Sequence, residues 1–74
     1  MKITIPTKPY YDFLEKCDPS RGEYETLRNG FVRQDDGAEV VEIHCDPAAA
    51  VKLLDLARQM KLGATFWIEK SLGF

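Results

Sequence analysis

The sequence has few of the features that mark secreted or membrane-spanning proteins. Among its 74 residues are only two cysteines and one histidine, and two cysteines are too few for the disulfide framework of a small secreted domain. No apolar run approaches the ~20 residues that a membrane-spanning helix needs. The first six residues are too few and too polar for a secretory signal peptide. We therefore expect a cytoplasmic protein with reduced thiols and no membrane partner.

Clustered positive charge is also missing. Ten Lys and Arg residues stand against twelve Asp and Glu residues, which gives a net charge of −2, and both signs are spread along the chain. A surface that binds nucleic acid needs a concentrated basic face to neutralise phosphates. The sequence therefore predicts no nucleic-acid partner.

Recognisable catalytic motifs are absent as well. The chain has no Gly-rich phosphate loop, no Gly-x-Ser-x-Gly elbow and no His-Glu-x-x-His pair. Its carboxylates are scattered, and most are spaced to pair with Lys or Arg along a helix, so no general acid–base dyad is indicated. We expect no catalytic residue, no cofactor and no enzymatic activity.

The clearest pattern that is present begins with a strand. Residues 39–45 are rich in β-branched side chains, and apolar and polar residues alternate there, which is typical of a strand with one buried face. Asp46 and Pro47 then suit the N-cap and the first position of a helix. A strand followed directly by a helix is therefore expected.

Residues 47–62 follow the 3.6-residue period of an amphipathic helix. Leu53, Leu54 and Ala57 lie on its apolar arc, and Lys52 lies on the polar one. Gly63 is placed where a left-handed residue commonly ends a helix. We expect this helix to be the main core element.

The rest of the chain adds weaker elements. Residues 31–45 predict a β-hairpin, because turn-forming residues at 34–38 separate two β-rich segments and Gly37 suits a positive φ. Residues 2–5 predict a short strand that pairs with this hairpin. Residues 9–17 predict a short helix with an apolar face.

Two stretches fit either a helix or a strand. In residues 19–29, Ser20 and Glu23 have the spacing of a capping box, whereas Gly22 disfavours a helix. Residues 64–72 carry both a β-rich start and a helical apolar face. We favour helices in both, and the alternative is two strands in a ferredoxin-like β-α-β-β-α-β order.

Together these elements predict one small α+β domain spanning residues 1–74. A chain of this size buries only ~60% of its unfolded surface, so its core is thin and oligomerisation would add stability.

Four residues are the natural candidates for a metal site: Cys17, His44, Cys45 and Asp46. Adjacent strand residues face opposite ways, so His44 and Cys45 do not readily share one ion. We expect both cysteines to be structural, His44 to lie on the polar sheet face beside Glu42, and no metal to be bound. A small ligand- or metal-binding accessory protein is the alternative function.

The aromatic residues are more numerous than so small a core needs. Exposed aromatics are enriched at protein–protein contacts. We therefore expect a protein-interaction or regulatory module that binds a protein partner or its own copy. The expected surface centres on Trp67, with Tyr11 and Val51 as neighbours.

Overall fold

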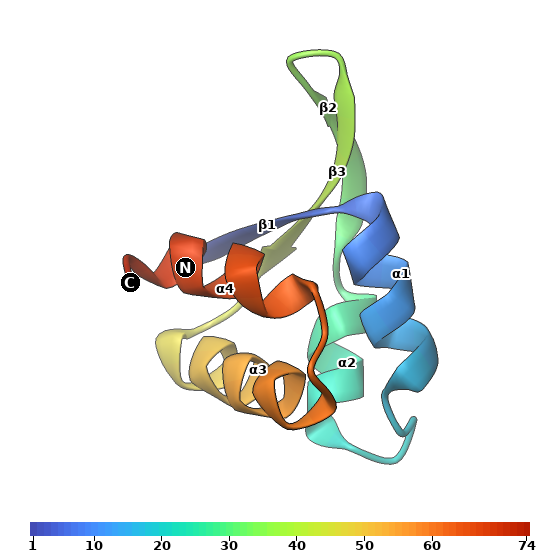
Figure 1. Cartoon of the computed structure of the whole chain (residues 1–74), viewed down its shortest axis with the longest axis vertical. Coiled ribbons are helices and arrows are strands. Elements are labelled where there is room, and N and C mark those ends of the chain that lie inside the picture. Colours follow the sequence, from blue (N-terminus) through green and yellow to red (C-terminus); the bar gives the residue numbers. More distant parts are fainter.

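The computed structural model describes all 74 residues. It is a small α+β domain of three strands and four helices (Figure 1). The elements in chain order are β1 (Lys2–Pro6), α1 (Thr7–Lys16), α2 (Gly22–Arg28), β2 (Phe31–Asp35), β3 (Ala38–His44), α3 (Pro47–Met60) and α4 (Ala64–Leu72). Both ambiguous stretches are helices, as we favoured, so the ferredoxin-like alternative is wrong.

The sheet is antiparallel, with the strand order β1-β3-β2. The predicted hairpin is confirmed as β2 and β3, and the predicted N-terminal strand pairs with β3. Asp36 and Gly37 form the turn with φ of 55° and 82°. Two positive φ values match the twist that a two-residue hairpin requires. The hairpin tip projects beyond the helices (Figure 1).

One face of the sheet carries the core. Alternation along the strands places Ile3, Ile5, Val41 and Ile43 on this face, all at most 1% exposed. They form one cluster with buried side chains of all four helices. The predicted core residues of the long helix are confirmed: Leu53, Leu54 and Ala57 are at most 2% exposed.

The end of α3 differs from the prediction. The helix stops at Met60 rather than residue 62, and Lys61, not Gly63, takes the left-handed conformation with φ of 55°. Gly63 has φ of −63° and begins α4 instead. The early turn lets the Leu62 amide bond to the Ala57 carbonyl at 3.1 Å and brings the Leu62 side chain into the core. Burial of Leu62 explains why the helix ends before the glycine.

The capping box predicted for α2 does not form. Asp18 accepts hydrogen bonds from the amide and hydroxyl of Ser20 at 2.9 Å, so the serine is held outside the helix. Glu23 pairs with Arg21 at 2.9 Å instead. The helix is attached to the core through its other end, where the Tyr10 hydroxyl donates to the Leu27 carbonyl at 2.6 Å.

Candidate functional site

The two outward edges of the sheet differ in how they are covered. Along β1, helix α4 lies beside the strand, and the Thr4 amide donates to the Ser71 hydroxyl at 3.4 Å. Pro6 has no amide hydrogen to offer at the same edge. The outward edge of β1 is therefore closed to a further strand.

The outward edge of β2 is open. The Cys45 amide bonds to the Met1 carbonyl and the Thr4 amide points to α4, so the odd-numbered residues of β3 bond to β1. Its even-numbered residues must then bond to β2. In that register the amide and carbonyl groups of Val32 and Gln34 point away from the sheet. No other element packs extensively on β2.

The side chains along this edge are exposed and mixed in character. Phe31 and Val32 are 49% and 47% exposed. Arg33 is half-buried, and its Nη1 lies 3.8 Å from the Asp35 carboxylate. We call residues 31–35 with their outward backbone groups the β2 edge.

The sheet face turned away from the core holds a charged cluster that fixes this strand. The Glu42 carboxylate accepts a hydrogen bond from Arg33 Nε at 2.6 Å and lies 2.6 Å from His44 Nε2. The hydrogen bond from His44 is the main cause that holds the pKa of Glu42 below its ordinary value. Burial opposes this shift, and the hydrogen bond and charge of Arg33 add to it. Lys2 Nζ is 3.9 Å away. Glu42 thus ties β2 to β3.

His44 lies where the sequence predicted. It is exposed on the polar face, pairs with Lys2 across the strands and bonds to Glu42. Its ring stacks on Phe31 with centroids 5.8 Å apart and planes 9° from parallel. Neither His44 nor Glu42 lines any of the three surface cavities. The arrangement orients Phe31 on the polar face.

The candidate metal ligands are not brought together. Cys17 is buried, and burial raises the pKa of its thiol; burial also raises the pKa of the half-buried Cys45. Asp46 caps α3 by accepting from the Ala49 amide at 2.7 Å. No group of three or more His, Cys, Asp or Glu side chains is placed to hold a metal ion. The metal-binding alternative stays a prediction without a geometric site.

The residues of the expected aromatic surface lie on three helices. Tyr11 and Val51 are exposed on α1 and α3, at 52% and 47%. Trp67 on α4 is half-buried against the core, and Phe66 beside it is 60% exposed. The cavity at Tyr11 includes neither Trp67 nor Val51. One continuous patch joining these residues stays a prediction.

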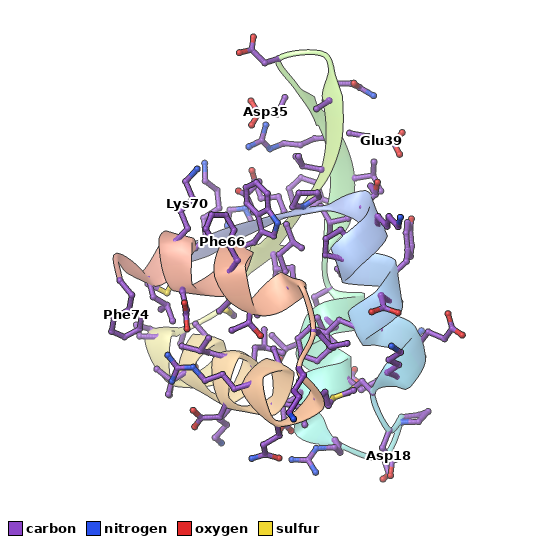
Figure 2. All side chains as sticks on the ribbon, in the orientation of Figure 1. Asp18, Asp35, Glu39, Phe66, Lys70 and Phe74 are labelled. Carbon is purple, nitrogen blue, oxygen red and sulfur yellow. The ribbon has the colours of Figure 1, made fainter.

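Trp67 does approach the hairpin. Together with Thr4, Lys70 and Ser71 it lines a shallow cavity that also includes Asp35, the last residue of β2. Figure 2 shows Asp35 on the projecting hairpin and Lys70 on the side of α4 that faces it. The tip of the β2 edge and the ring at Trp67 therefore border one surface.

Comparisons with protein-family models, with curated proteins and with solved structures found no match. None of the four helices combines the length and the apolar composition that a membrane-spanning segment requires.

Proposed function

We propose that this protein is a non-enzymatic protein-interaction module that binds an extended polypeptide segment along the β2 edge. The observation that carries the proposal is the asymmetry of the sheet. The outward amide of Thr4 is bonded to Ser71 on α4. On β2, the amides of Val32 and Gln34 have no partner, and the Gln34 carbonyl accepts only a 3.4 Å hydrogen bond from the Arg33 side chain. An open sheet edge is a template for strand addition, in which backbone hydrogen bonds supply affinity.

The side chains of the β2 edge give such binding its selectivity. Alternate residues of an added strand face opposite sides of the sheet. On the outer side they would meet Phe31, Arg33 and Asp35, and on the other side Val32 and Gln34. The favoured segment therefore alternates an acidic or aromatic residue with a β-branched one, because such residues complement Arg33 and Phe31 and favour strands.

The test uses a proline that blocks the edge without breaking the hairpin. Gln34→Pro removes an amide hydrogen that points outward, and an edge position of this kind tolerates proline. Glu39→Pro is the matched control: Glu39 lies directly opposite Gln34, and its amide points away from β2. Both variants should keep the fold, as circular dichroism would show.

A random-peptide display library would then be selected on the wild-type protein. We expect enriched extended peptides whose binding is lost with Gln34→Pro and kept with Glu39→Pro. Peptides that bind the Gln34→Pro variant as well as the wild type, or a selection on the monomeric wild-type protein that enriches none, would reject the β2 edge as a binding site.

A further inference from the structure

We infer that the strand that occupies the β2 edge is β2 of a second copy of this chain, which makes the protein an antiparallel, two-fold symmetric dimer. This inference rests on the proposed function, because it names the partner of the same edge. It is carried by the charge pattern of β2, by the closed edge of β1 and by the size of the domain.

A two-fold axis perpendicular to the sheet pairs identical edges in antiparallel fashion. With the axis at Arg33, Val32 of one copy lies opposite Gln34 of the second. With the axis at Gln34, the two Gln34 residues lie opposite each other and Val32 lies opposite the turn residue Asp36. Both arrangements join two three-stranded sheets into one of six strands, in the order β1-β3-β2-β2-β3-β1.

The charges on β2 complement a copy of themselves. Arg33 and Asp35 lie two residues apart on the same face of the strand. With the axis at Gln34, Arg33 lies opposite Asp35 of the second copy; with the axis at Arg33, the two are diagonal neighbours, within reach of a long side chain. Because of the two-fold symmetry, each Arg33–Asp35 pair between the copies forms twice. Glu42, bonded to Arg33 in each copy, offsets the repulsion between the two guanidinium groups.

The covered edge of β1 limits the assembly to two copies. If both edges of the sheet were open, strand addition would continue into a fibre. Here the Thr4 amide is bonded to Ser71, so a second copy uses the only free edge and leaves none. Pairing of the two β2 strands also covers the exposed side chains of Phe31 and Val32. The core of a 74-residue domain is too small to bury them within one copy.

The experiment measures self-association of the full chain by sedimentation equilibrium across a wide range of protein concentration. The wild-type protein and Glu39→Pro should form a dimer and no larger species. Gln34→Pro should lower the association constant at least about tenfold, because backbone hydrogen bonds across the edge are lost.

Two charge-reversal variants test whether the partner is a second copy of this chain. Asp35→Arg places two positive side chains together on each side of the axis, and we expect an association constant about tenfold lower. Glu39→Arg makes the same change in net charge on β3 and should leave the association constant unchanged.

The outcomes separate this inference from the proposed function. A wild-type protein that stays monomeric, or a dimer that Gln34→Pro leaves intact, overturns the inference. If the monomeric protein still binds selected peptides in a manner that Gln34→Pro abolishes, the β2 edge is a binding site for other chains. If no peptide binds either, both proposals fail.

Discussion

Gly30 lies where α2 leads into β2, and there the chain runs against the core. A Cβ atom at this residue would lie 2.7 Å from Val41 Cγ1 and 3.2 Å from the Leu27 carbonyl oxygen. Val41 and Leu27 are buried, so any shift that makes room for the added carbon disturbs packed core side chains. We expect Gly30→Ala to lower the free energy of unfolding by about 1–3 kcal/mol, measured by urea denaturation.

Gly22 provides the control for this change. It is the first residue of α2, and nothing lies within 4 Å of a Cβ added there. Alanine favours a helix over glycine, so Gly22→Ala should leave the unfolding free energy unchanged or raise it by up to ~1 kcal/mol. Equal losses at both glycines would contradict the close approach at Gly30.

Glu42 gives the protein a predictable response to acid. Its pKa is lowered in the folded state from an ordinary value of 4.5, chiefly by the hydrogen bond with His44; burial opposes this shift, and the hydrogen bond from Arg33 adds to it. A group with a depressed folded-state pKa contributes stability that is complete above its unfolded pKa and is lost as the pH falls through the folded value. This contribution should therefore disappear below pH 4.5.

The measurement compares melting temperatures of the wild type and Glu42→Gln between pH 7 and pH 3. We expect the variant to melt at a lower temperature at pH 7 and the difference to shrink as the pH falls below about 4. A difference that stays constant over this range would show that the Glu42 charge does not stabilise the fold.

At the scale of elements, α3 has a well-defined orientation. Leu53 is fully buried in the cluster, whereas its neighbour Lys52 is exposed. Leu53→Ala should lower the unfolding free energy by ~2–5 kcal/mol, because it removes buried methyl groups and leaves a cavity. Lys52→Ala should change it by less than ~0.5 kcal/mol. Equal effects of the two substitutions on the melting temperature would contradict the orientation described for α3.

Helix α4 presents two aromatic rings with different roles. Phe66 packs edge-to-face on Trp67 at 5.1 Å but is itself 60% exposed, whereas Trp67 packs on the core. We expect Trp67→Ala to cost about 2 kcal/mol of stability and Phe66→Ala less than ~0.5 kcal/mol. Thermal or urea unfolding of the two variants checks this, and equal costs would contradict the packing described.

This difference makes Phe66 the better position at which to test the predicted aromatic surface. Phe66→Ala removes exposed ring area beside Trp67 with little effect on the fold. If the surface around Trp67 anchors a partner, affinity should fall by ~2 kcal/mol or more. Unchanged affinity would show that the rings of α4 do not anchor that partner.

How well the sequence predicts each element depends on how local its signal is. The Asp46 cap, Pro47 and the apolar arc of α3 are local features, and all three are confirmed. The end of α3 was missed because burial of Leu62, a tertiary contact, moved the left-handed residue to Lys61. Residues 64–72 became a helix because Ala64 and Ile68 pack into the core on one side.

The candidate site could be predicted only in part, for the same reason. Alternation along residues 39–45 was enough to place His44 on the polar face beside Glu42. The free β2 edge depends on the strand order and on α4 covering β1, and no local pattern records either. The local sequence pattern predicts the hairpin. Which edge of the sheet stays free is decided by contacts between residues that are distant in the chain.

At the scale of the whole molecule, association and stability should be linked. Only folded copies present an ordered β2 edge, so dimer formation stabilises the folded state by mass action. For a domain of this size each kcal/mol shifts the melting temperature by roughly 4–8 °C. We therefore expect the melting temperature of the wild type to rise by up to about 10 °C for each hundredfold increase in protein concentration.

The two proline variants show whether this dependence arises at the β2 edge. The melting temperature of Glu39→Pro should rise with concentration as in the wild type, because its proline lies on β3 with its ring away from β2. That of Gln34→Pro should be independent of concentration, since its folded monomer gains nothing from a second copy. A concentration dependence that persists in Gln34→Pro would place the self-association on another surface, and the exposed rings of α4 would then be the next to vary.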